Sequence, residues 1–145
     1  MPAAQPDHRS VTLERLDEGV YLARNRRGDE LRFGSKAGDA FTPVELLLAA
    51  IAGCTAVDVD VVTGRRSPAE EFTARVDARV EHEGGNRLTD IVLTFHVTFP
   101  EGEAGDAARE ILPRALRTSH DRTCTVSRTI EAGTPVAVRI DGMPG

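Results

Sequence analysis

The sequence predicts an α+β fold in which antiparallel sheets pack around one long, buried central helix. Three observations predict it: an apolar run after Thr42 with no polar face for three turns, an alternating hairpin pattern between Phe72 and Phe99, and short alternating segments from Val11 to Phe33. Alternation with period two is typical of strands, whereas a helix that is apolar all round must be covered on every side. With 145 residues, the chain has the length of one domain.

The chain is expected to begin with a loose leader, residues 1–10, followed by a single domain over residues 11–145. Within Val11–Phe33 the pairs Glu18-Gly19 and Gly28-Asp29 interrupt the alternation. Because such pairs are typical of turns, we expect two or three short strands in a meander or hairpin.

Thr42 opens the predicted central helix. A threonine N-cap, Pro43 at the first helical position and Glu45 three residues after the cap together form a capping box. The apolar run then continues to about Gly64, which gives about 22 residues and ~33 Å of helix. A chain of this size does not surround such a rod, so we expect a second subunit to cover part of it.

A long antiparallel hairpin is the second predicted element. Apolar side chains alternate with polar ones on both of its strands, at Phe72, Ala74, Val76, Ala78 and Val80 and again at Ile91, Leu93, Phe95, Val97 and Phe99. The sequence Gly84-Gly85-Asn86 between them favours a turn.

The C-terminal part is predicted to be helical first and extended last. Residues 105–120 have a helical pattern, but Pro113 lacks a backbone N–H, so we expect a kink or a break there. Cys124 begins a further short helix or turn, and residues 135–140 have the pattern of a closing strand.

Composition and charge favour a cytoplasmic protein that binds neither nucleic acid nor membrane. The net charge is −5, which argues against a broad nucleic-acid or anionic-membrane footprint. No uninterrupted apolar run reaches the ~18 residues of a membrane span. The first residues also lack the basic and apolar segments of a secretory signal.

The usual signatures of metal and cofactor sites are missing from the sequence. Four histidines and two cysteines occur without an HExxH or CxxC spacing, and no glycine-rich phosphate-binding motif or GxSxG elbow is present. We therefore expect no metal and no bound cofactor.

The two cysteines, Cys54 and Cys124, are the remaining candidates for chemistry. In a reducing compartment such a distant pair is either two inert thiols or a redox pair. Cys54 lies inside the apolar helix, where burial raises a thiol pKa. Cys124 precedes a possible helix, whose N-terminal amides favour a thiolate. The residues alone leave both alternatives open.

Two motifs resemble the OsmC/Ohr family, which comprises osmotically inducible protein C and the organic hydroperoxide resistance proteins. The segment Thr42–Asp58 is similar to the central-helix signature, and Thr123–Ile130 is similar to the second signature. Each motif holds one of the two cysteines, and the predicted element order matches the family fold across nearly the whole chain. The helix is more similar to the OsmC-like branch than to Ohr proper.

The resemblance implies an OsmC-like fold, an intertwined homodimer and a thiol peroxidase that acts on alkyl or lipid hydroperoxides in oxidative or osmotic stress. It implies that the Cys54 thiolate attacks the peroxide and becomes a sulfenic acid, with which Cys124 condenses to an intramolecular disulfide. A dithiol reductant, a lipoyl protein or a small thiol, then restores both thiols. An apolar pocket suits an alkyl hydroperoxide better than hydrogen peroxide.

The family also uses a glutamate and an arginine, for which the resemblance favours Glu45 and Arg32. Ohr proteins have the glutamate directly after the motif proline, where this chain has Val44. Glu45 also completes the capping box. Nine helical residues place it ~13 Å from Cys54 on the opposite side, so an arginine bridge or the other subunit must connect them. The Ohr-like alternatives to Arg32 are Arg24, Arg26 and Arg27.

Two residues near the cysteines carry a structural interpretation. Thr125 stands where the family usually has proline, which frees one backbone N–H beside Cys124. Asp58, one turn after Cys54, is interpreted as a structural partner or as the lip of a pocket.

Two other functions stay open: a non-catalytic dimer that binds a small apolar ligand, and a thiol redox sensor.

Overall fold

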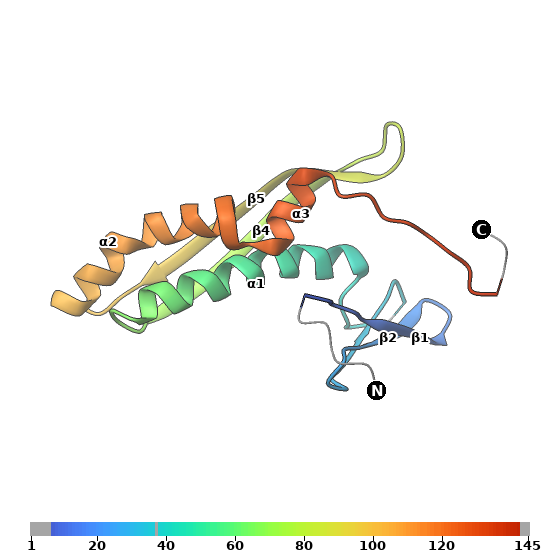
Figure 1. The fold of residues 1–145 in the computed structure, drawn as a ribbon, viewed down its shortest axis with the longest axis horizontal. Coiled ribbons are helices and arrows are strands. Elements are labelled where there is room, and N and C mark those ends of the chain that lie inside the picture. Colours follow the sequence, from blue (N-terminus) through green and yellow to red (C-terminus); the bar gives the residue numbers. More distant parts are fainter. Residues whose placement is uncertain (1–6, 37, 143–145) are drawn as a thin grey trace. The chain divides into compact units, whose positions relative to one another are not determined.

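The computed structural model describes residues 7–36 and 38–142. It combines antiparallel sheets with helices, which confirms the predicted α+β class (Figure 1). The chain divides into two compact units, Met1–Leu47 and Leu48–Gly145. The predicted leader includes residues 1–6, which lie outside the described residues, so the leader and the single domain stay predictions.

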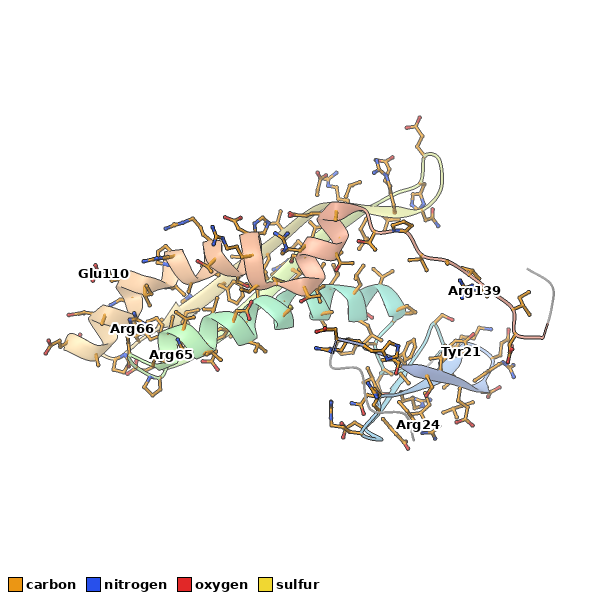
Figure 2. The ribbon with its side chains drawn as sticks, in the orientation of Figure 1. Tyr21, Arg24, Arg65, Arg66, Glu110 and Arg139 are labelled. Carbon is orange, nitrogen blue, oxygen red and sulfur yellow. The ribbon has the colours of Figure 1, made fainter. Side chains whose placement is uncertain are left out.

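The first unit holds a three-stranded antiparallel sheet in the order β1-β2-β3, as the alternation predicted. Its strands are β1 (Thr12–Asp17), β2 (Val20–Arg24) and β3 (Glu30–Phe33). Arg24 connects all three strands because it forms ion pairs with Glu14 on β1 at 2.7 Å and with Glu30 on β3 at 3.2 Å. Tyr21 and Arg24 are labelled on this sheet in Figure 2.

Helix α1 (Pro43–Gly64) begins and ends where the sequence predicted. The capping box forms: the Thr42 N–H donates to Glu45 Oε1 at 2.9 Å, and the Glu45 N–H donates to Thr42 Oγ1 at 3.3 Å. At the other end, the Arg66 guanidinium donates to the carbonyl of Val62 at 3.1 Å. Figure 2 labels Arg65 and Arg66 at this end. Side-chain hydrogen bonds thus satisfy backbone groups at both helix ends.

Only one stripe of α1 is buried. The buried residues recur every four positions, at Ile51, Thr55, Val59 and Thr63. On the opposite side Val57 and Val61 are 65% and 52% exposed. A single chain therefore covers only one face of this helix, and cover of the other face by a second subunit stays a prediction.

Helix α1 also has the length and composition of a membrane-spanning helix, with a mean hydropathy of 1.9. The core helices of soluble proteins share this property. Its sequence also contains three acidic residues, Glu45, Asp58 and Asp60, and Asp58 forms hydrogen bonds to a distant part of the chain.

The predicted hairpin forms from β4 (Glu71–Glu81) and β5 (Arg87–Thr98). Phe72 lies opposite Val97, and Ala74 lies opposite Phe95. The rings of Phe72 and Phe95 meet edge to face, with centroids 5.8 Å apart. Such a pair stabilises the two strands beyond the area that they bury.

The C-terminal helices are α2 (Glu103–Thr118), the single π-helical turn η1 (Ser119–Thr123) and α3 (Thr125–Ala132). Of the predicted kink or break at Pro113, the break does not occur, because α2 continues through it with Ala108 and Ala115 buried on either side. Near the start of α2, a Cβ on Gly105 would lie 1.7 Å from the Pro100 carbonyl oxygen, so only glycine fits.

Residues 135–140 do not form the predicted strand. They are extended but pair with no strand among the described residues, and Val136 and Val138 are almost fully exposed. Alternation describes which side chains share a face, whereas a strand also needs a sheet edge to pair with. Elsewhere in the second unit, α1, α2 and α3 lie over the β4–β5 hairpin (Figure 1).

Candidate functional site

The two cysteines lie side by side in the second unit. Cys54 comes from the middle of α1, and Cys124 is the N-cap residue of α3. Both are free thiols, and the side chain of each changes the pKa of the other. Cys124 is fully buried, whereas Cys54 is half-buried. Of the two alternatives that the sequence left open, this proximity favours a redox pair.

The sulfur of Cys124 accepts hydrogen bonds from two neighbours. The Thr55 hydroxyl of α1 donates to it at 3.4 Å, and the Ser127 backbone N–H in the first turn of α3 donates at 3.5 Å. Burial by itself raises the pKa of Cys124, but the bonds from Ser127 and Thr55 outweigh burial and leave its pKa below the ordinary value. Hydrogen bonds to the sulfur favour its charged form, the thiolate.

Cys54 has the opposite balance. Burial raises its pKa, the backbone amide of Val126 lowers it in part, and the adjacent Cys124 raises it further. The N–H of Thr125 adds a smaller lowering, which a proline at this position would not supply. Because the net effect is a raised pKa for Cys54 and a lowered pKa for Cys124, Cys124 is the thiol that loses its proton first.

Asp58 joins α1 to the turn that carries Cys124. Its Oδ2 accepts hydrogen bonds from Ser119 Oγ at 2.7 Å and from Thr123 Oγ1 at 2.8 Å, which are the first and last residues of η1. The backbone N–H of Cys124 donates to the Ser119 carbonyl at 2.7 Å. Asp58 is therefore a structural partner, one of the two interpretations that the sequence allowed.

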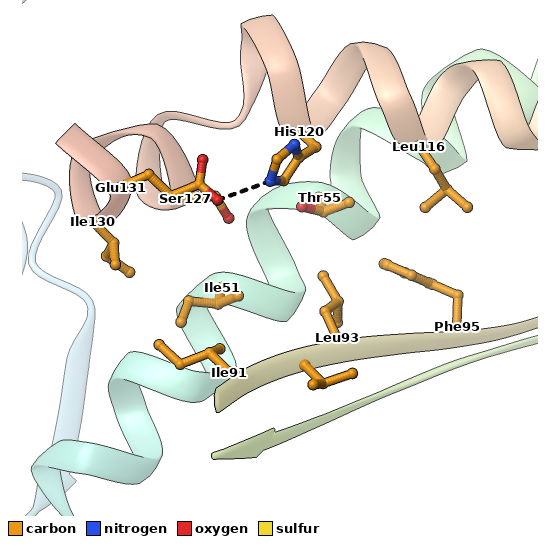
Figure 3. Close-up of a pocket in the computed structure, with 11 residues that line it drawn as sticks. Ile51, Thr55, Ile91, Leu93, Phe95, Leu116, His120, Ser127, Ile130 and Glu131 are labelled. Carbon is orange, nitrogen blue, oxygen red and sulfur yellow. Dashed lines mark hydrogen bonds and ion pairs between the residues drawn. The ribbon is translucent and has the colours of Figure 1, made fainter. Parts of the chain in front are cut away.

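A mostly apolar cavity of about 510 Å³ lies in the second unit (Figure 3), and neither cysteine is among its lining residues. Its apolar side chains come from α1, β5, α2 and α3, and Thr55 and Ser127 also line it. These two residues also donate to the Cys124 sulfur, so they connect the cavity to the cysteine pair. The apolar lining consists of Ile51, Ile91, Val92, Leu93, Phe95, Leu116 and Ile130.

His120 and Glu131 form the charged side of the cavity. His120 Nε2 lies 3.0 Å from Glu131 Oε1, the contact dashed in Figure 3, and its Nδ1 lies 3.0 Å from Asp121 Oδ1. The hydrogen bonds with Asp121 and Glu131 raise the pKa of His120 above its ordinary value. A polar group thus borders a cavity whose other walls are mostly hydrocarbon.

Glu45 and Arg32 belong to the first unit. Glu45 lies in the first turn of α1, and its hydrogen bonds from Thr42 lower the pKa of its carboxyl group. Arg32 lies on β3 opposite Leu22 and has an exposed side chain. Of the alternatives to Arg32, Arg24 is engaged in its two ion pairs. The catalytic roles of Glu45 and Arg32 stay predictions.

Sequence reasoning missed Thr55 and Ser127. Ser127 carried a detectable signal, because it stands three residues after Cys124, where an N-cap side chain meets a backbone N–H. Thr55 carried a weaker one, as a hydroxyl inside an apolar helix. Its contact with Cys124 joins residues 69 positions apart, and no local pattern specifies it.

Comparisons with known proteins identify the family and the fold to which this chain is similar. Residues 36–139 match the family model of OsmC-like proteins. An uncharacterized protein of Mycobacterium tuberculosis is 26% identical over 129 residues, which are 88% of this chain and 93% of that protein.

Two solved structures are similar in fold. A hypothetical protein from Aquifex aeolicus has a TM-score of 0.71 at 22% identity, covering 88% of this chain and 90% of its own. An OsmC-like protein of unknown function from Vibrio cholerae has a TM-score of 0.69 at 14% identity, covering 86% and 94%. The family model spans well over half of the sequence, and the chain therefore belongs to the OsmC-like protein family.

Proposed function

We propose that this protein is a thiol peroxidase that reduces organic hydroperoxides to alcohols with the pair Cys54 and Cys124. The proposal depends on one observation: the two thiols are adjacent, and two residues that donate to or flank the Cys124 sulfur also line an apolar cavity. Membership of the OsmC-like family adds to it, because the two family motifs each contribute one of these cysteines.

In the proposed first step, Cys54 is the thiol that attacks. Cys124, in its thiolate form, takes the Cys54 proton. The Cys54 sulfur then forms a bond to the distal peroxide oxygen as the O–O bond breaks. The alkoxide leaves with the proton from Cys124 and becomes the alcohol, so that Cys54 is oxidised to a sulfenic acid and Cys124 is again a thiolate.

In the second step, the Cys124 thiolate attacks the Cys54 sulfur. The S–S bond forms, the S–O bond breaks, and hydroxide leaves to become water. The lowered pKa of Cys124 helps here, because the thiolate is the attacking species. A dithiol, either a lipoyl group or a small thiol, then reduces the disulfide by exchange.

The apolar cavity supports an organic hydroperoxide as the substrate. Its volume of about 510 Å³ is within the range of small-molecule sites. Transfer of an alkyl tail from water to this lining stabilises the complex by about 0.8 kcal/mol per CH₂ group. Hydrogen peroxide has no tail and gains nothing from the cavity.

The remaining parts of the proposal follow from the family resemblance. Arg32 and Glu45 are proposed as the charged residues that orient the peroxide, and the working form is proposed as a homodimer. A cytoplasmic location is proposed as well, because thiols are kept reduced there.

Intact-mass measurement after one equivalent of cumene hydroperoxide tests the proposal. The wild type should lose two hydrogens as the disulfide forms. Cys124→Ser should gain one oxygen on Cys54, more slowly than the wild type, because serine does not replace the thiolate as a base. The two masses together assign the attacking and resolving roles.

A different result would assign a different function. If both proteins stay unmodified while folded, the peroxidase proposal is wrong. The cavity then favours the second candidate, a protein that binds a small apolar ligand. Extraction of bound ligand and its identification by mass spectrometry distinguishes that candidate.

A further inference from the structure

We infer that Asp58 is a positioning residue that holds the η1 turn against α1, so that Cys124 meets Cys54 when the disulfide forms. The inference deepens the proposed function and rests on it for the meaning of that disulfide. Asp58 itself touches neither sulfur in the described contacts, and it acts through the two hydroxyl groups that it binds.

The geometry of η1 supports this role. A π-helical turn is rare, occurs mostly as a single turn, and is frequent at functional sites. Here it spans Ser119–Thr123 and ends directly at Cys124. Asp58 binds the first and the last residue of the turn through the same oxygen, which fixes both ends at one point on α1.

Three hydrogen bonds between α1 and the C-terminal segment thus determine where Cys124 lies. Thr55 holds its sulfur, and Asp58 holds the two ends of the preceding turn. Thr55 and Asp58 are three residues apart and therefore lie on the same face of the helix. Cys54 is the neighbour of Thr55 in sequence, so the same helix that carries one thiol positions the other.

The charge of Asp58 is otherwise unfavourable at this place. A carboxylate one helical turn from Cys54 opposes formation of a thiolate and is costly in an apolar helix. Two hydroxyl donors at 2.7 and 2.8 Å compensate for that cost. Hydrogen bonds to an ionised acceptor are about twice as strong as those between neutral groups, which suits a residue that must hold a turn in place.

The opposite side of η1 is held by α3. The Arg128 guanidinium donates to the carbonyl of Asp121 inside the turn, and the Arg128 backbone N–H donates to the Cys124 carbonyl at 3.0 Å. These contacts remain when Asp58 is replaced. We therefore expect the turn to loosen toward α1 and not to unfold.

The test compares rates of disulfide formation in Asp58→Ala, Asp58→Asn and a matched control, Asp60→Ala. Asp60 lies on the same helix, two residues further along, and has an exposed side chain. A double variant, Ser119→Ala with Thr123→Val, removes the two donors and leaves the carboxylate. Each protein is oxidised with cumene hydroperoxide and, separately, with diamide. Samples taken over time are quenched with acid, and their intact mass is measured by mass spectrometry.

Diamide forms the disulfide without a peroxide, because it takes one hydrogen from each thiol while the S–S bond forms. Asp58→Ala and the double variant should close the disulfide about tenfold more slowly than the wild type with either oxidant, as misplaced reacting groups do. The rate of Asp58→Asn should lie between those of the wild type and Asp58→Ala, since its amide oxygen still accepts a hydrogen bond. Asp60→Ala should match the wild type.

The outcomes separate the inference from the proposed function. Equal rates in Asp58→Ala, the double variant and Asp60→Ala overturn the inference. If peroxide does not oxidise the wild type, but diamide forms the disulfide more slowly in Asp58→Ala than in the wild type, the peroxidase proposal fails and the positioning role stands. If neither oxidant closes the disulfide in the wild type, both fail. Thermal unfolding of each variant shows whether a slow rate has a folding cause.

Discussion

Thr55 and Ser127 determine which cysteine loses its proton first. Both thiols are partly or fully shielded from water, which disfavours either thiolate. The difference is in their donors, because the Ser127 side chain, the Thr55 hydroxyl at 3.4 Å and the Ser127 backbone N–H at 3.5 Å all lower the pKa of Cys124. Cys54 faces first-turn amides of α3, yet these do not outweigh its burial. Hydrogen bonding therefore separates two residues of identical chemistry.

Replacing Thr55 with valine tests this separation. In a Cys54→Ser background only Cys124 titrates, and thiolate absorbance near 240 nm follows it. Thr55→Val keeps the shape but removes the hydroxyl, so the Cys124 pKa should rise by roughly one unit, the equivalent of a lost hydrogen bond to a charged group. At a pH between the Cys124 pKa values of the two proteins, the Thr55→Val variant should then contain less Cys124 thiolate than the protein with Thr55.

Thr63→Val is the matched control. Thr63 is a buried threonine on the same face of α1, but its hydroxyl donates to the Val59 carbonyl at 2.9 Å and not to sulfur. The Cys124 pKa should stay unchanged in this variant. An equal rise in both variants would mean that helix packing sets the pKa, and the role of the Thr55 hydroxyl would have to be abandoned.

Single residues were predictable only where a local pattern or a family motif carried them. Cys54 and Cys124 stood out because they are the two cysteines of the chain, each inside a motif. Glu45 was predicted as a cap, and its hydrogen bonds with Thr42 confirm that part. The contacts of Asp58 with Ser119 and Thr123 were not predictable in detail, because they join segments more than sixty residues apart.

Helix α3 contributes to the site through its N-terminus. Cys124 adopts an extended conformation, with φ −75° and ψ 95°, and the helix begins at the next residue. The amides of the first helical turn have no partner within the helix and are available to an acceptor. Those of Thr125 and Val126 lower the pKa of the neighbouring Cys54 in part.

Thr125→Pro tests the contribution of this helix terminus. Proline fits the first position of a helix, and the extended conformation of Cys124 tolerates a following proline, so α3 should be retained. The variant loses the N–H that faces Cys54, and the Cys54 pKa should rise further. Alkylation of Cys54 by iodoacetamide, measured against pH in a Cys124→Ser background, should shift to higher pH.

Thr125→Ala keeps the backbone N–H and loses only the side chain, so its alkylation profile should match that of the wild type. If the alanine variant shifts as much as the proline variant, the side chain of Thr125 is responsible. An unchanged profile in Thr125→Pro would show that the amide contributes nothing to Cys54.

At the element level, helices and hairpins were predictable where the signals are local. The capping box placed the start of α1, and alternation with a glycine turn placed β4 and β5. Pro113 was misjudged because tertiary packing retains α2 around a missing hydrogen bond. The segment 135–140 was misjudged because strand formation depends on a partner edge that the segment itself does not contain.

The whole molecule has an apolar surface that one chain leaves uncovered. Val57 and Val61 are one helical turn apart on α1 and lie about 200° around the helix from the buried stripe. An apolar residue on each side of a helix is typical of one that is covered on both sides. Contiguous exposed apolar side chains of this kind mark interaction surfaces.

We therefore expect the protein to form a homodimer that covers this face of α1. Light scattering behind size exclusion should give twice the chain mass of 15.6 kDa for the wild type. A double variant, Val57→Glu with Val61→Glu, should give the chain mass, because burying two unpaired carboxylates costs several kcal/mol. Arg65→Glu, just beyond the end of the same helix, adds negative charge outside the apolar face and should stay dimeric. If the wild type has the mass of one chain, no second subunit contributes to the site. Glu45 could then be connected to Cys54 only through an arginine of its own chain.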